Sequence, residues 1–342
     1  MGNFSEYVVS RKDRRSRNLL DNTSFNIWAR GSPLTSAGYT ADRWIVGSSG
    51  VVAWSASKSA TVPTGFSGAS MRIEVTTPDA SVTTTDHLHL KQHIEGSSLL
   101  PLVGRYGTVS FWVYSTLAGV YNFYVRNASD RSYVTTYTIN QANTWEYKRI
   151  TIPFNYSGGT WNYDHQLGLI VGWPLAMGAT YVTGTTDEWV SGVYMGSADQ
   201  CDFVGDTNVF YMTSPQLELG RIATSYQGLD PKQDQEICAR YYEVNFVYKH
   251  GLSTGTGFGT VWSNMQYRTK KRTTPTSVTA ALVGDNLDIY QAGVGWNVAS
   301  SLVVNGYNDH QARYYMTDTV NSIYTSGNCN LIRCTFYISC DL

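Results

Sequence analysis

This sequence of 342 residues has little charge. Asp, Glu, Lys and Arg together make up 15% of it, and the net charge at pH 7 is −1. Soluble domains usually carry about a quarter charged residues. A chain so close to neutral has no strong electrostatic field to attract a nucleic acid or an anionic membrane. We therefore expect neither of these among its main partners.

Long apolar runs are also missing. No stretch approaches the roughly 18 apolar residues that a membrane-spanning helix requires. The first residues, Met1 to Glu6, do not combine a basic segment with an apolar core, which is the pattern of a secretion signal. The sequence therefore predicts a protein that is made in a cytoplasm and is not inserted in a membrane.

Cysteine is scarce and shows no metal-binding or redox pattern. The five cysteines are Cys201, Cys238, Cys329, Cys334 and Cys340. No two of them have the C-x-x-C spacing of a zinc site, and a cytoplasm keeps thiols reduced. We expect small buried apolar side chains rather than disulfides.

Signatures of catalysis are absent. The sequence has no G-x-S-x-G, H-E-x-x-H, P-loop or dinucleotide-binding motif. Cleavage of a glycan would require two carboxylates about 5 to 10 Å apart. Acidic residues are sparse, and the neighbours Asp187 and Glu188 would point to opposite faces of a strand. We expect no enzymatic activity and no cofactor.

Aromatic residues are abundant instead, at 13% of the chain, with 25 Tyr and 10 Trp. Such residues favour β-strands. From residue 19 onward, short alternating runs are separated by turn residues, as in 68–75, 109–114, 121–126 and 145–154. We interpret 109–114 and 121–126 as a hairpin. Strands at this spacing predict an antiparallel jelly roll or β-sandwich.

One segment predicts a helix. Asp230 can cap it, Pro231 suits its first turn, and Ile237, Cys238, Tyr241 and Tyr242 form one apolar stripe over 231–242. β-strand patterns then return up to the final strand. In that strand one face carries Ile332, Cys334, Phe336, Ile338 and Cys340. The predicted fold is all-β: an arm over 1–18, a jelly roll over 19–228, and a linking helix with a smaller second β-sandwich over 229–342.

The arm at the start of the chain is basic. Its cations are Arg11, Lys12, Arg14, Arg15 and Arg17. The arm lacks the interleaved aromatic residues of a nucleic-acid surface. Two interpretations remain: the arm docks into an acidic partner, or it is a solvated tail.

A histidine-rich run, residues 86–93, is the most notable polar cluster. On a strand, His87, His89, Lys91 and His93 share one face. Histidines two residues apart on a three-fold axis could bind a transition metal, which makes His87 and His89 candidate ligands. Lys91 in the same row would repel a cation, and the favoured interpretation is a solvated or inter-subunit face.

Aromatic side chains near polar groups are the usual means of binding sugars. Trp161 and Tyr163 follow the pair Gly158-Gly159, which predicts a loop. Tyr124, Arg126 and Tyr133 are further candidates. The alternative for any one aromatic residue is a place in the core.

Several phrases of the sequence resemble, in their order, a family of bacteriophage tail-fibre and minor virion proteins. They are 18–22, 24–28, 92–96, 107–112, 216–220, 223–226, 238–243 and 272–276. In that family a carbohydrate-binding-module-like jelly roll precedes a short helix and a small β domain. We interpret the phrases as scaffold: Phe111 and Trp112 would fill core or inter-sheet space, and 216–219 would form the closing strand.

The resemblance implies a structural protein of the virion, assembled in the cytoplasm of a bacterial host. It would be a tail fibre, spike or adhesion subunit, and we expect a homotrimer. Its partners would be other virion proteins, reached through the arm, and a polysaccharide of the host surface. The alternatives are a glycan-degrading tailspike enzyme and a purely structural decoration of the capsid or tail.

Such jelly rolls often hold a structural Ca²⁺ through oxygen ligands. Asn26 stands where many relatives carry an acidic residue, which weakens that expectation. A second oxygen-rich group consists of Asp199, Asp202 and Asp206, but its spacing does not match an EF-hand loop.

Overall fold

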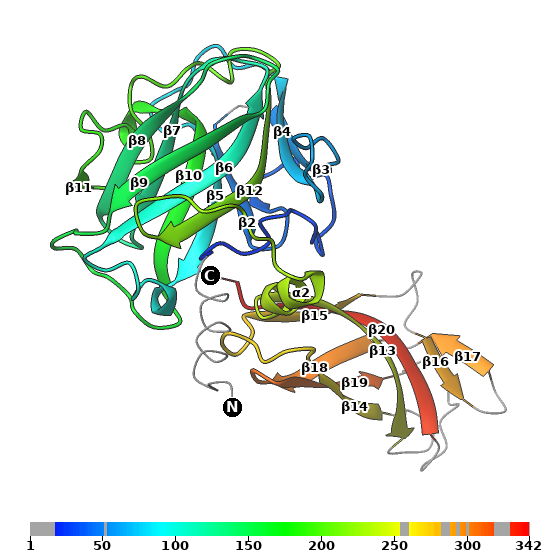
Figure 1. Ribbon diagram of the computed structural model, residues 1–342. Coiled ribbons are helices and arrows are strands. Elements are labelled where there is room, and N and C mark those ends of the chain that lie inside the picture. Colours follow the sequence, from blue (N-terminus) through cyan, green and yellow to red (C-terminus); the bar gives the residue numbers. More distant parts are fainter. Residues whose placement is uncertain are drawn as a thin grey trace, which may run out of the picture. The chain divides into compact units, whose positions relative to one another are not determined.

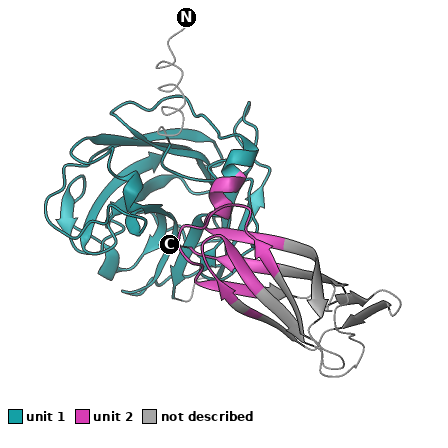
Figure 2. Ribbon diagram, turned by 90° about the horizontal axis from the view of Figure 1, so that it is seen from below, with its two compact units in different colours: residues 1–234, 342 teal, residues 235–341 magenta. Residues whose placement is uncertain are grey.

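The computed structural model divides into two compact units, residues 1–234 with 342, and residues 235–341 (Figure 2). It describes residues 18–50, 53–253, 260–281, 288–291, 295–298, 301–317 and 329–341. Residues 1–17 of the predicted docking arm, which include all five of its cations, lie outside these ranges. The division falls inside helix α2 (Pro231–Ala239), a few residues after the predicted boundary at 228.

The first unit consists of two antiparallel sheets (Figure 1). The seven-stranded sheet has the order β1 (Gly38–Tyr39), β2 (Trp44–Ser49), β5 (His87–Glu95), β10 (Leu167–Met177), β7 (Gly119–Arg126), β8 (Arg131–Ile139) and β11 (Trp189–Ser191). The five-stranded sheet has the order β3 (Ala53–Ser59), β4 (Ser70–Thr77), β12 (Val209–Leu219), β6 (Tyr106–Ser115) and β9 (Glu146–Pro153). Two short 3₁₀ turns, η1 (Gly96–Ser98) and η2 (Ala179–Tyr181), follow β5 and β10. The predicted all-β, antiparallel sandwich is confirmed.

An aromatic core lies between the two sheets. Trp173 of β10 contacts Phe111 of β6, Phe123 of β7 and Trp44 of β2, with ring centroids 5.2 to 5.7 Å apart. All four side chains have no exposed surface. Along each strand every second side chain points into this core. The remaining side chains point away from it and form the outer face of each sheet.

The predicted hairpin of 109–114 and 121–126 is wrong. These runs form β6 and β7, which belong to different sheets: β6 pairs with β9 and β12, and β7 pairs with β8 and β10. Two consecutive strands each have one apolar face, whether they form a hairpin or belong to opposite sheets of a sandwich. The alternation of apolar residues is the same in both cases, so it cannot distinguish them.

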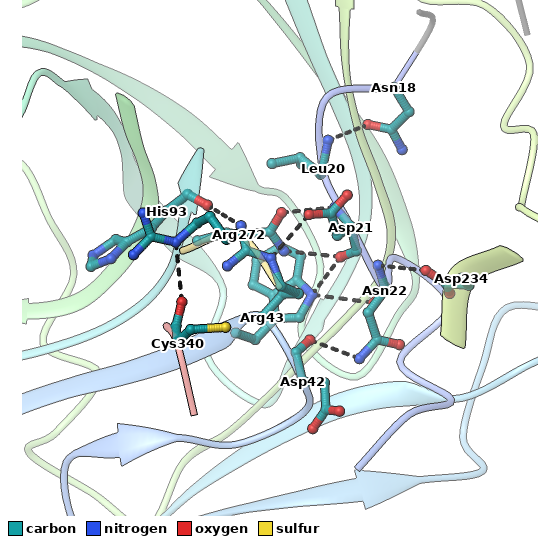
Figure 3. Close-up of polar contacts among 12 residues, drawn as sticks. Asn18, Leu20, Asp21, Asn22, Asp42, Arg43, His93, Asp234, Arg272 and Cys340 are labelled. Atoms are coloured by element: carbon teal, nitrogen blue, oxygen red, sulfur yellow. Dashed lines mark hydrogen bonds and ion pairs between the residues drawn. The ribbon is translucent and has the colours of Figure 1, made fainter. Parts of the chain in front are cut away.

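The segment that follows the arm is bound to the sandwich through polar contacts (Figure 3). The side-chain oxygen of Gln92 accepts a hydrogen bond from the amide of Asp21 at 2.7 Å, and its nitrogen donates to the Asp21 carbonyl at 2.9 Å. The buried Arg43 donates to the Asp21 carboxylate at 3.0 Å and to the carbonyl of His93 at 2.6 Å. Asn18 links the segment to the closing strand, because its Oδ1 accepts from the amide of Leu217.

The closing strand β12 carries a buried polar network. Gln216 donates to Glu218 at 2.8 Å, and Glu218 accepts from the amide and hydroxyl of Thr224 at 2.7 and 2.8 Å. Beyond it, Tyr226 shares a hydrogen bond of 2.9 Å with Thr23. These contacts give the phrases at 216–220 and 223–226 a structural role.

Helix α2 begins as the sequence predicts and ends earlier. The carboxylate of Asp230 accepts from the amide of Lys232 at 2.9 Å and so caps the first turn. The helix stops at Ala239, and Tyr242 already begins the next strand, so the predicted range of 231–242 is too long. No helix in the described ranges is long and apolar enough to cross a bilayer.

The second unit is one antiparallel sheet of eight strands in the described ranges. In order they are β17 (Gly295–Val298), β16 (Asp288–Gln291), β20 (Cys329–Ser339), β13 (Tyr242–Ser253), β14 (Thr260–Gln266), β19 (Gln311–Thr317) and β18 (Ser301–Tyr307), while β15 (Ser277–Ala281) also pairs with β20. Phe336, Ile338 and Cys340 are buried, and the residues between them are not. The predicted alternation of the last strand is confirmed there. The side chains of Ile332 and Cys334 lie outside the described residues.

Candidate functional site

Two of the predicted sugar-binding aromatic residues are buried. Tyr124 has no exposed surface, and Tyr133 is 3% exposed. The register pairs Tyr133 with Val125 of β7, so Tyr133 points into the core. Tyr124 points outward, but it lies in a small apolar cluster with Val134, Ile170 and Met195. Neither ring can stack on a sugar, so these two predictions are wrong.

The predicted loop aromatic residues lie at the margin of the core. The ring of Trp161 stacks on Tyr156 with centroids 3.5 Å apart, and its Nε1 donates to the carbonyl of Gly158 at 3.0 Å. Tyr163 is 41% exposed, and its hydroxyl lies 3.2 Å from that of Tyr156. One face of Trp161 is therefore already covered, and Tyr163 is the most accessible ring of the predicted set.

A larger group of accessible rings lies on the outer face of the five-stranded sheet. We call it the aromatic platform; it consists of Phe66, Trp112, Tyr114, Trp145, Tyr147 and Tyr211. Each ring is at least partly exposed, and Tyr147 is 37% exposed. Trp112 was expected in the core. Instead Phe111 points inward and Trp112 outward, because neighbours on a strand face opposite ways.

Strand pairing brings the platform together. Trp112 lies opposite Tyr147 of β9, and Tyr114 lies opposite Tyr211 of β12. The Trp112 ring contacts Tyr147 and Phe66, each with a centroid distance of 5.4 Å. The Tyr114 ring lies 5.3 Å from Tyr211 and 5.7 Å from Trp145. The rings thus extend across three neighbouring strands.

Polar groups border these rings. Arg72 donates from Nε to the hydroxyl of Tyr211 at 3.1 Å and forms an ion pair of 2.5 Å with Glu74. The hydrogen bond to Glu74 raises the pKa of Arg72, which stays charged. The hydroxyl of Tyr114 donates to the side-chain oxygen of Asn143 at 3.2 Å. The platform therefore combines flat apolar faces with fixed donors and acceptors, as sugar recognition requires.

The sequence does carry a signal for the platform. Phe111, Trp112 and Tyr114 lie on one strand, 109–114, where neighbouring residues point to opposite faces of the sheet. These three side chains therefore cannot all face the core. Tyr147 and Tyr211 likewise occupy the outward positions of their own strands. What the sequence does not show is that β9, β6 and β12 are neighbours, since these strands are far apart along the chain.

The histidine row lies on the outer face of the seven-stranded sheet, as predicted, but it is not fully solvated. His89 is 2% exposed, and its Nδ1 lies 3.3 Å from the hydroxyl of Tyr124. Burial keeps the pKa of His89 well below its ordinary value. Burial and the neighbouring Arg126 lower the pKa of Lys91 to about 8. No group of three or more His, Cys, Asp or Glu side chains in the described part of the chain could hold a metal ion.

Three of the candidate calcium ligands, Asn26, Asp202 and Asp206, have hydrogen-bond partners within the chain. The carbonyl of Asn26 accepts from the ammonium group of Lys58 at 2.8 Å. Asp202 accepts from the amide of Gly205, and Asp206 accepts from the amide and hydroxyl of Thr207. These carboxylates therefore stabilise local turns.

No known protein family and no curated protein sequence matches the chain. Solved structures give distant similarities. The enzymatically active domain of tailspike protein 4 of bacteriophage CBA120 is 12% identical, with a TM-score of 0.32 over 59% of this chain. The chain spans only 21% of that protein.

Carbohydrate-binding modules are similar to the same degree. A family 4 module is 14% identical over 58% of this chain and 99% of its own, with a TM-score of 0.31. The family 11 module of Clostridium thermocellum is 15% identical over 52% of this chain and 88% of its own, with a TM-score of 0.28. At these TM-scores the ligand and the activity have to be argued from the surfaces of the chain itself.

Proposed function

We propose that this protein is a structural subunit of a bacteriophage particle that binds a glycan of the host surface without cleaving it. The aromatic platform carries the binding part of this proposal. Large apolar patches on a protein surface usually mark an interaction site. Here the rings are bordered by Arg72, Glu74 and Asn143, which can exchange hydrogen bonds with sugar hydroxyls.

The place in the virion is supported by the sequence. The ordered phrases from 18–22 to 272–276 resemble tail-fibre and minor virion proteins. In this chain the phrases at 18–22 and 216–226 hold the sandwich together, so the resemblance concerns the scaffold. On this proposal the platform supplies the recognition, and the position of the subunit in a tail fibre or spike brings it to the host.

Binding can be tested on an array of bacterial surface polysaccharides. We expect Trp112→Ala and Tyr211→Ala each to weaken binding about tenfold, because an aromatic contact contributes about 1.5 kcal/mol. Tyr307→Ala, which removes an exposed ring of the second unit, is the matched control. Wild-type affinity in both platform variants would contradict the proposed site, and an array without any bound glycan would contradict the function.

Catalysis can be tested on the same ligands. The bound polysaccharide is incubated with the protein, and newly formed reducing ends are measured. We expect none to be released. Release that depends on the protein would favour the glycan-degrading tailspike instead.

A further inference from the structure

A group of cations on the outer face of the seven-stranded sheet has no function in the proposal above. It consists of Lys91 and Arg126, which lie beside the histidines of β5, and we call these two residues the basic cluster. The cluster lies on the opposite side of the sandwich from the aromatic platform, since the core separates the two sheets.

The strand register places Lys91 and Arg126 on either side of β10. Gly172 of β10 pairs with Lys91 on one side and with Tyr124 on the other, and Arg126 is the next outward residue after Tyr124. Gly172 contributes no side chain, and the ring of Tyr124 occupies the space above it. A Cβ at this position would lie 2.3 Å from that ring. The two cations therefore lie on either side of Gly172, while the Tyr124 ring and Ile170 between them are buried.

The charges of this cluster are not balanced by the described residues. Both cations are half-buried, and none of the described carboxylates forms an ion pair with either of them. The Nε of Arg126 is buried and has no hydrogen-bond partner in the described part of the chain. Burial lowers the pKa of Arg126, and burial together with Arg126 lowers that of Lys91.

Two acids lie at the ends of β5, and neither forms an ion pair with Lys91 or Arg126 in the described part of the chain. Asp86, at the start of β5, accepts from the amide of Thr83 at 2.8 Å. Glu95, at the other end of the strand, is 7% exposed and has an interaction of its own. Burial and the neighbouring Lys91 keep the pKa of His89 well below its ordinary value, so His89 is neutral at pH 7. Unbalanced charge that is partly removed from water costs free energy, and a bound anion would remove this cost.

We propose that Lys91 and Arg126 bind the carboxylate of an acidic sugar, so that the chain recognises acidic polysaccharides. The proposal rests on the proposed glycan-binding function for the class of ligand. The guanidinium of Arg126 can hold a carboxylate through two parallel hydrogen bonds, and Lys91 adds a point charge.

The test compares three acidic polymers, polygalacturonate, alginate and hyaluronate, with their carboxyl-reduced neutral forms. Binding of the full chain is measured by affinity electrophoresis. We expect at least one acidic polymer to bind tenfold or more tightly than its reduced form. Lys91→Met and Arg126→Met should each remove most of this difference, whereas Lys91→Arg should retain it. Lys232→Met, which removes an exposed cation of α2, is the control for net charge.

Two results would overturn the proposal. One is that none of the three acidic polymers binds better than its reduced form. The other is that Lys91→Met and Arg126→Met bind as the wild type does. Competition by millimolar inorganic phosphate, without any preference for acidic polymers, would identify a general anion site and would also contradict it. Failure here is distinct from failure of the platform, because Trp112→Ala should leave the acidic preference unchanged.

Discussion

Single buried polar residues connect parts of this chain that are distant in sequence. Asp234 of α2 is 5% exposed and accepts a hydrogen bond of 3.0 Å from the amide of Asn22 (Figure 3). In the second unit, the ammonium group of Lys271, which has no exposed surface, forms an ion pair of 2.6 Å with Glu243. Residues of this kind carry a large cost if their partner is lost.

Asp234 should make the stability of the first unit depend on pH. Burial raises its pKa to about 6. A carboxyl with a raised pKa favours folding while it is protonated, and this contribution is lost as the pH rises through about 6. We expect Asp234→Asn, which keeps an acceptor for Asn22, to gain up to about 3 kcal/mol over the wild type between pH 4 and pH 7. Urea denaturation at both pH values measures this difference, and it should be absent in Glu236→Gln, an exposed neighbour.

At the level of elements, the alternation of apolar and polar residues predicts where a strand lies. It does not predict which strand pairs with which. The predicted runs at 68–75, 145–154 and 332–340 form parts of β4, β9 and β20, because their apolar residues recur at every second position. The helix was recognised from its cap, Asp230, and its end was misplaced. Tyr241 and Tyr242 continue the helical spacing of the apolar residues, but pairing with β20 takes Tyr242 into β13.

The segment 18–28 should depend on Gln92 for its attachment to β5. Gln92 has no exposed surface and satisfies both backbone groups of Asp21. Gln92→Met keeps the volume and leaves the Asp21 amide without a partner, whereas the Asp21 carbonyl keeps the hydrogen bond of 3.1 Å from Nε1 of Trp44. The loss should cost about 1 to 3 kcal/mol. Thermal unfolding should show the loss, while Gln141→Met, at an exposed position, should unfold as the wild type. Equal stability of the two variants would argue against this attachment.

At the level of the whole molecule, we expect three copies of the chain to assemble. Fibre proteins are usually symmetric, and exposed aromatic surface favours association. Light scattering of the intact protein at micromolar concentration should give three times the chain mass of 38.0 kDa. A monomer mass at that concentration would exclude the trimer.

The basic arm remains the predicted link to the rest of the virion. Each exposed ion pair contributes only about 0 to 1 kcal/mol and weakens in salt, so several must act together. Deletion of residues 1–17 should leave folding and glycan binding intact and abolish incorporation into particles. Normal incorporation of the shortened protein would show that the arm is a solvated tail.

The sequence by itself determined that the chain is all-β, where most strands lie, and that a capped helix follows the sandwich. These properties depend on the spacing and type of neighbouring residues. Only the tertiary structure decided which rings are accessible. Tyr124 and Tyr133 looked suitable for sugar binding, but the fold covers one and turns the other inward. Trp112 looked like a core residue, yet it joins Tyr147 and Tyr211 on one surface, because strand pairing depends on contacts between distant segments.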